Sequence, residues 1–136
     1  MKIFVTSPNE NWVLDRFKKE WVGHTRQYFT NNISEADVLW FLDGYSWRSI
    51  PQQLLSGKKV VATVHHIVPE KFSASDFLVR DQIIDYYHVP CEKTKKQIKA
   101  YTDKPIFVLP FWVNDKIWID MRKSSKELRE KYNLPQ

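Results

Sequence analysis

The sequence has a single cysteine, Cys91, and no apolar run that approaches the length of a membrane span. One thiol excludes an internal disulfide, which agrees with a reducing compartment. A span needs ~20 consecutive apolar residues, so no membrane-crossing helix is expected. The first residues enter a strand-like apolar segment at once, without the hydrophobic region of a signal peptide. We therefore expect a soluble, cytoplasmic protein.

Signatures of three further function classes are missing from the sequence. The formal net charge of +5 permits anionic partners, but no helix-turn-helix, zinc or RNA-binding motif accompanies it, so no nucleic-acid partner is expected. The first predicted strand ends at Thr6-Ser7 and not in the acidic cluster of a receiver domain. His65 and His66 are adjacent, and neighbouring strand residues point to opposite faces. With no third ligand evident, no metal site is predicted.

Aromatic residues are abundant, at 15% of the chain with six tryptophans. The 136 residues suit one domain with one core, and a core of that size buries only a few aromatic side chains. We expect some of the tryptophans at a binding site or an interface.

Strand-like and helix-like segments alternate along the chain. Buried strands are predicted over residues 2–6, 36–42, 60–64, 86–89 and 106–109, with a further short strand over 25–29. The central strands are apolar throughout, which is typical of strands covered on both faces. This pattern predicts an α/β fold, a doubly wound and mostly parallel sheet flanked by helices in the Rossmann-like manner.

The expected helices follow from caps and from apolar spacing. Ser7 and Glu10 resemble a capping box around Pro8, which predicts a helix from there to Gly23. Further helices are expected over 47–57 and 75–84. Cys91 begins another helix, and its place on the apolar face predicts a buried structural thiol. A last capping box over 124–127 predicts a helix near the C-terminal end.

Function is expected at the carboxyl ends of the strands, where ligands gather in such sheets. The segments predicted to lie there are Ser7–Asn9, Asp43–Tyr45, His65–Glu70, Pro90–Glu92 and Pro110–Asn114.

Four segments carry a resemblance to a known family. They are residues 58–66 (KKVVATVHH), 85–92 (DYYHVPCE), 106–114 (IFVLPFWVN) and 125–135 (SKELREKYNLP). In order and spacing they resemble the acceptor-side, N-terminal domain of retaining glycosyltransferases of the group 1 (family 4) type, which have the GT-B fold. The resemblance implies a Rossmann-like domain over 1–115. It also implies that 116–136 are a linker and the start of a C-terminal domain that the sequence does not contain.

The sequence departs from the family pattern at four places. The first loop, Ser7–Glu10, has no glycine where the family is usually glycine-rich. His66 stands where the family has Asp. Phe111-Trp112 replaces an Asn-Gly pair, and Asn114 replaces an Asp.

The resemblance implies a sugar-transfer function for the longer protein and a site for this half. The N-terminal half would position a glycan or lipid-linked sugar acceptor. The other half would hold the nucleotide-sugar, so no cofactor is expected beyond that donor substrate, and the isolated chain is expected to be inactive. His65 matches a histidine that contacts the donor sugar and is the catalytic candidate. The substrate-binding candidates are Ser7, Asn9, Asp43, Gly44, Tyr45, His66, Trp112 and Asn114.

Several of these residues also have a purely structural interpretation. His65 either contacts a sugar or is a strand-end histidine satisfied by backbone. Asp43 either binds a sugar hydroxyl or forms a turn or helix cap. Ser7 is expected to cap its helix, which leaves room for an anion there. Tyr45, Trp47 and Trp112 either stack on sugar rings or pack. One or both of Trp112 and Trp118 are expected to pack against the second domain.

Two alternatives stay open at the level of the whole protein. The helix after Pro90 carries Lys93, Lys95, Lys96 and Lys99. They form either a solvated face or a docking surface for anionic lipid, which would place the protein at the inner face of the plasma membrane.

The second alternative is a stand-alone doubly wound α/β domain that binds a ligand or a protein without catalysis.

Overall fold

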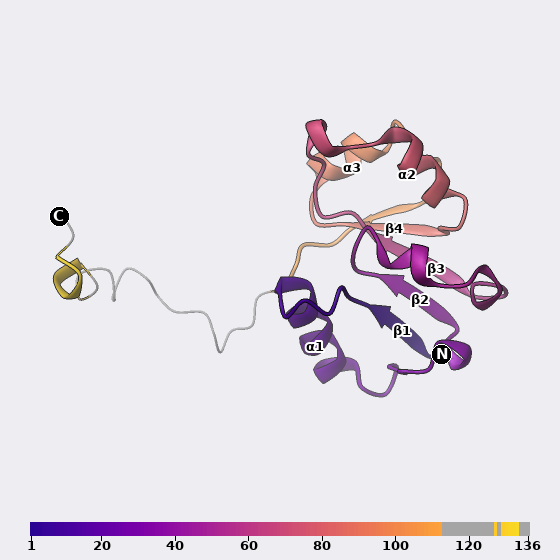
Figure 1. Cartoon of the computed structure of the whole chain (residues 1–136), viewed down its shortest axis with the longest axis horizontal. Coiled ribbons are helices and arrows are strands. Elements are labelled where there is room, and N and C mark those ends of the chain that lie inside the picture. The colour runs from indigo at the N-terminus through magenta and orange to yellow at the C-terminus, as the bar shows by residue number, and fades with distance from the viewer. Residues whose placement is uncertain (113–126, 128, 134–136) are drawn as a thin grey trace.

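A computed structural model describes residues 1–112, 127 and 129–133, and the predicted domain boundary at residue 115 lies outside them. Within the described part, five strands form an all-parallel sheet in the order β1-β2-β3-β4-β5 (Figure 1). Their bounds are β1 Ile3–Thr6, β2 Val38–Phe41, β3 Lys59–Thr63, β4 Tyr86–Val89 and β5 Ile106–Val108. The predicted α/β fold with a parallel sheet is therefore confirmed.

The direction of the chain across the sheet reverses at β1. Phe29 forms a single parallel bridge with Ile3, on the edge of β1 that faces away from β2. The Ile3 N–H donates to the Tyr28 carbonyl at 2.7 Å, and the Thr30 N–H donates to the Ile3 carbonyl at 3.1 Å. The strand predicted over 25–29 is reduced to this bridge, because helix α1 (Val13–Thr25) runs past Gly23. The reversal makes the carboxyl ends of β1 and β2 the switch point of the sheet.

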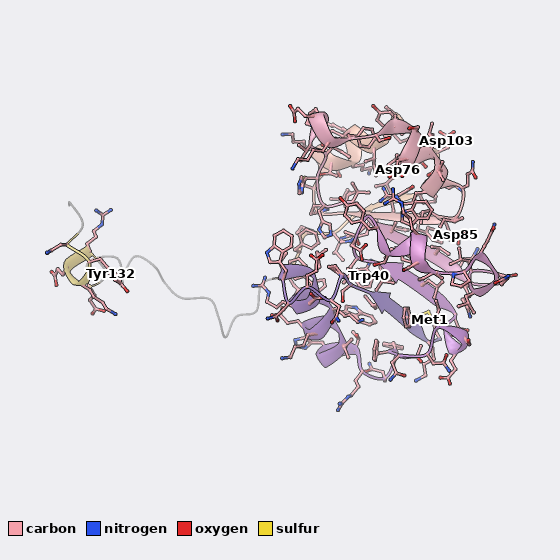
Figure 2. The ribbon with its side chains drawn as sticks, in the orientation of Figure 1. Met1, Trp40, Asp76, Asp85, Asp103 and Tyr132 are labelled. Carbon is pink, nitrogen blue, oxygen red and sulfur yellow. The ribbon has the colours of Figure 1, made fainter. Side chains whose placement is uncertain are left out.

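Helices cover both faces of the sheet. On one face, Trp21 of α1 meets Trp40 of β2 edge-on at 5.6 Å, and Figure 2 labels Trp40 on the strand. Helices α2 (Ala74–Asp81) and α3 (Glu92–Ile98) lie on the other face. The buried side chains of that face are Phe41, Val60, Ala62, Val64, Phe77, Ile84, Tyr87, Val89 and Ile98. This core holds the strand ends in fixed positions.

The first helix starts later than predicted, so the capping role expected of Ser7 is wrong. Asn9 and Asn11 have φ values of 58° and 57°, a left-handed conformation that an α-helix cannot include. The cap is made by Asp15, whose carboxylate accepts the backbone N–H of Asn9 at 3.0 Å and of Trp12 at 3.2 Å. Hydrogen bonding from the Ser7 hydroxyl is the largest cause that lowers the pKa of Asp15.

The helix predicted over 47–57 is wrong as well. It is replaced by two 3₁₀ helices, η2 (Ser46–Ser49) and η3 (Gln52–Leu54), on either side of Pro51. Proline has no N–H to donate and restricts the residue before it to extended conformations, so the helix cannot continue. Two further short 3₁₀ helices are η1 (Ile33–Glu35) and η4 (Pro69–Lys71).

Cys91 is exposed, which corrects the prediction of a buried thiol. It is the residue before α3 and has extended backbone, so it does not lie on the apolar face of the helix. Its Sγ lies 3.5 Å from the Thr94 hydroxyl. That hydrogen bond is the largest cause that lowers the pKa of the Cys91 thiol.

Candidate functional site

A cleft of about 370 Å³ lies at the switch point, where β1 ends. One wall comes from β1 and α1, and the other comes from η1, η2 and η3. The lining residues are Phe4, Thr6, Ser7, Lys18, Ile33, Ser46, Ser49, Ile50, Pro51 and Leu54. An apolar floor with a few polar groups, at the carboxyl ends of parallel strands, is the usual form of a small-molecule site.

Asp43 holds the turn that carries Ser46, one of the residues that line the cleft. Its carboxylate is buried, with 4% of the residue exposed. It accepts the backbone N–H groups of Tyr45 at 2.7 Å and of Ser46 at 2.6 Å, and also the Ser46 hydroxyl. These bonds are those of a turn residue that fixes η2, and they favour the structural interpretation of Asp43. The Gly44 carbonyl accepts the Trp47 indole N–H at 3.0 Å and completes the same turn.

Tyr45 is the most exposed aromatic residue beside the cleft, at 74%. The Arg48 guanidinium lies 5.8 Å from its ring and 5.2 Å from the ring of Trp47. Arg48 also forms an ion pair with Asp76 of α2, which connects this segment to that helix. The Tyr45 ring is thus held from one side and exposed to solvent, a suitable platform for a flat ligand face.

His65 follows β3 and is partly buried. Its Nε2 lies 2.6 Å from the Leu42 carbonyl. Because a carbonyl only accepts, Nε2 carries the proton, and Nδ1 of the neutral ring is an acceptor. Nδ1 has no partner among the described residues. Burial is the main cause that lowers the pKa of His65, so the neutral ring is favoured. His66 is exposed.

Phe111 and Trp112 pack against α1 of the same domain. The Phe111 ring stacks on Phe17 at 4.8 Å and on His65 at 5.0 Å. The Trp112 indole N–H donates to the Glu20 carboxylate at 3.0 Å. The structure therefore places Trp112 on α1. The expectation that Trp112 or Trp118 packs against a second domain stays a prediction. Asn114 and Trp118 lie outside the described residues.

A buried hydrogen-bonded chain joins four strand ends, and sequence analysis missed it. The Trp40 indole N–H donates to the Thr63 hydroxyl at 2.9 Å, and that hydroxyl lies 3.1 Å from His88 Nδ1. His88 Nε2 lies 2.8 Å from the Leu109 carbonyl and so carries the proton. The Thr63 hydroxyl therefore donates to Nδ1. The available signal was a histidine inside the otherwise apolar and aromatic strand β4.

The lysines differ in environment. Lys18, in the cleft, is partly buried, and burial is the main cause that lowers its pKa. On α3, Lys95 pairs with Glu92 at 3.9 Å and Lys99 pairs with Asp103 at 4.0 Å. Lys93 and Lys96 are exposed on the same helix.

Comparison with protein-family models, curated proteins and solved structures gave no match. Among the described residues, no helix is long and apolar enough to cross a bilayer. The described part of the chain also has no group of three or more His, Cys, Asp or Glu side chains arranged to hold a metal ion. What the site binds must therefore be inferred from the geometry of this chain.

Proposed function

We propose that the chain is the acceptor-binding half of a glycosyltransferase. The protein would transfer a sugar from a nucleotide-sugar donor to a glycan or lipid-linked acceptor. The order of motifs along the sequence supports this assignment, as does the parallel sheet. The observation that carries it is the cleft at the switch point, with serine and threonine hydroxyls on both walls and the exposed ring of Tyr45 beside it.

The polarity of the cleft suits a polyol. The Ser46 hydroxyl donates to Asp43, and the Ser49 hydroxyl donates to the Ser46 carbonyl at 2.8 Å. With their hydrogens engaged, both oxygens keep lone pairs that can accept hydrogen bonds. A saccharide brings many hydroxyl donors and an apolar ring face that stacks on aromatic rings. The serine oxygens and Tyr45 match these two properties.

Sugar transfer requires an acceptor hydroxyl held close to the anomeric carbon as the nucleotide diphosphate leaves. In this proposal the cleft holds the acceptor, and His65 Nδ1 accepts a hydrogen bond from a sugar hydroxyl. The nucleotide-sugar is bound mainly by a second domain, so residues 1–136 alone transfer little or no sugar. The location proposed is the cytoplasm, with the exposed lysines of α3 in reach of the membrane surface.

Saccharide binding to the 136-residue chain tests the proposal. Saturation-transfer NMR with mono- and disaccharides is expected to show binding. Ser49→Trp fills the cleft and should remove it. Ser75→Trp is the matched control, because Ser75 is exposed on α2 and is not among the described residues that line the cleft. Equal binding by both variants, or none by the unaltered chain, would count against a saccharide site here.

A stand-alone binding domain is the second candidate. It is favoured by one observation, that all the described residues that line the cleft belong to this one domain. A panel of UDP-, GDP- and ADP-sugars separates the two candidates when offered to the natural protein with a saccharide acceptor. Transfer supports the glycosyltransferase. Saccharide binding without transfer from any donor supports the binding domain.

A further inference from the structure

Among the described residues that line the cleft, Lys18 is the only charged one. The other lining residues are apolar or carry hydroxyl groups. Lys18 forms no ion pair with any described residue. Partial burial of an ammonium group that forms no ion pair costs hydration free energy, and the negative charge of a ligand would offset that cost.

The nearest acidic group does not neutralise this lysine by direct contact. Asp15 acts on Lys18 only through its charge. Its carboxylate accepts the backbone N–H groups of Asn9 and Trp12, and also that of Glu10 at 2.9 Å. Asp15 also occupies the start of α1, so an incoming anion cannot use those backbone groups. An anion in the cleft therefore depends on Lys18.

The two walls of the cleft differ in what they offer a ligand. On the wall from η2, the hydroxyl hydrogens of Ser46 and Ser49 are engaged, which favours ligand donors there. On the wall from β1 and α1, the Thr6 hydroxyl reaches the Trp40 carbonyl only at 3.5 Å. That distance is long for a hydroxyl donor, so the Thr6 hydrogen can turn towards a ligand. Lys18 and Thr6 can thus donate hydrogen bonds to a ligand in the same cleft in which Ser46 and Ser49 can accept them.

We propose that the acceptor taken by this cleft carries a phosphate group, which Lys18 and Thr6 bind while the serine wall binds the sugar hydroxyls. This inference rests on the saccharide site proposed above and names its substrate class. An ammonium–phosphate contact is a charge-assisted hydrogen bond, about twice as strong as a neutral one. Phosphate binding also offsets the burial that lowers the pKa of Lys18. The phosphate comes either from a soluble sugar phosphate or from a lipid headgroup.

Titration calorimetry with glucose and glucose 6-phosphate tests the inference. We expect the unaltered chain to bind the phosphate ester at least about tenfold more tightly than glucose. Lys18→Met should abolish this preference, and Lys18→Arg should keep most of it. The matched control is Lys19→Met, because Lys19 is the next residue of α1 and is exposed. Circular dichroism establishes that each variant is folded.

A vesicle-binding experiment distinguishes a lipid headgroup from a soluble sugar phosphate as the source of the phosphate. The chain is sedimented with phosphatidylcholine vesicles that do or do not contain phosphatidic acid. Binding that needs phosphatidic acid and is lost in Lys18→Met indicates a lipid headgroup and supports the inference. Binding that persists in Lys18→Met, without a preference for glucose 6-phosphate, overturns it.

The outcomes separate this inference from the proposed function. Equal affinity for glucose and glucose 6-phosphate, unchanged by Lys18→Met, overturns the phosphate inference alone, provided that Ser49→Trp still removes glucose binding. Absence of binding in every arm overturns both proposals.

Discussion

The imidazole of His65 stacks on the ring of Phe111, with the ring centres 5.0 Å apart and the planes at 24°. The two residues follow different strands, β3 and β5, so the contact joins two loops at the carboxyl edge of the sheet. It covers one face of the imidazole, while the Leu42 carbonyl fixes Nε2. The tautomer, the position and the lowered pKa of His65 thus have identifiable structural causes.

The burial of His65 predicts a pH dependence of stability. The folded state holds this histidine below its usual pKa of 6.5, so around pH 6 the unfolded chain binds more protons. The contribution of His65 to the free energy of unfolding is therefore fully present above pH 6.5, and it is lost as the pH falls below that value. Urea unfolding of the unaltered chain should show that the free energy of unfolding falls between pH 7.5 and 5.5. The fall should be smaller in His65→Gln. His24→Gln, at an exposed position of α1, should show the same pH dependence of the free energy of unfolding as the unaltered chain.

Removing the stacked ring should release His65. In Phe111→Ala the imidazole becomes more accessible to water, and the NMR-measured pKa of His65 should rise towards its usual value. The lost contacts with Phe17 and His65 should lower the free energy of unfolding by about 1–3 kcal/mol, less than for a fully buried phenylalanine. A pKa of His65 that does not change in Phe111→Ala would show that the stack is not what shields the ring.

The hydrogen-bonded chain from Trp40 to His88 should be sensitive to its central member. Thr63→Val keeps the shape of the side chain but leaves the Trp40 indole N–H and His88 Nδ1 without a partner. We expect a loss of roughly 2–4 kcal/mol in the free energy of unfolding. Thr94→Val is the control, since Thr94 is also buried but its hydroxyl hydrogen-bonds only to the Cys91 sulfur among the described residues. Similar losses in the two variants would contradict a special role for Thr63.

Substitutions of Asp43 distinguish its two interpretations. Asn can still accept the backbone N–H groups of Tyr45 and Ser46, whereas Ala cannot. If Asp43 only holds the turn, Asp43→Asn should keep saccharide affinity and Asp43→Ala should lose both affinity and about 1–3 kcal/mol of stability. Loss of affinity in a stable, folded Asp43→Asn variant would instead show direct contact between the carboxylate and the ligand.

The sheet was predictable from sequence because its strands are short apolar segments covered on both faces, as in residues 60–64. The start of α1 was not, since a capping pattern at Ser7 gives no sign that Asn9 and Asn11 adopt left-handed backbone. The helical spacing of apolar residues over 47–57 led to a wrong prediction, because Pro51 prevents a continuous helix there.

The candidate site was only partly predictable. The loops at the switch point were identified by the rule for parallel sheets, and Ser7 does line the cleft. Lys18, Ser46 and Ser49 were missed, because they reach the cleft from helices and single-sequence patterns do not show which exposed polar residues converge. The packing of Phe111 and Trp112 on α1 depends on tertiary contacts that no local pattern encodes.

The most direct test of a saccharide site at the switch point is a nitrogen-15 NMR titration of the 136-residue chain with maltose. The account predicts shifts that saturate and are concentrated at the backbone amides of Thr6, Ser7, Ser46 and Ser49, with the α3 amides unchanged. No saturating shifts, or shifts centred on α3 or on the exposed β5 residue Phe107, would contradict it.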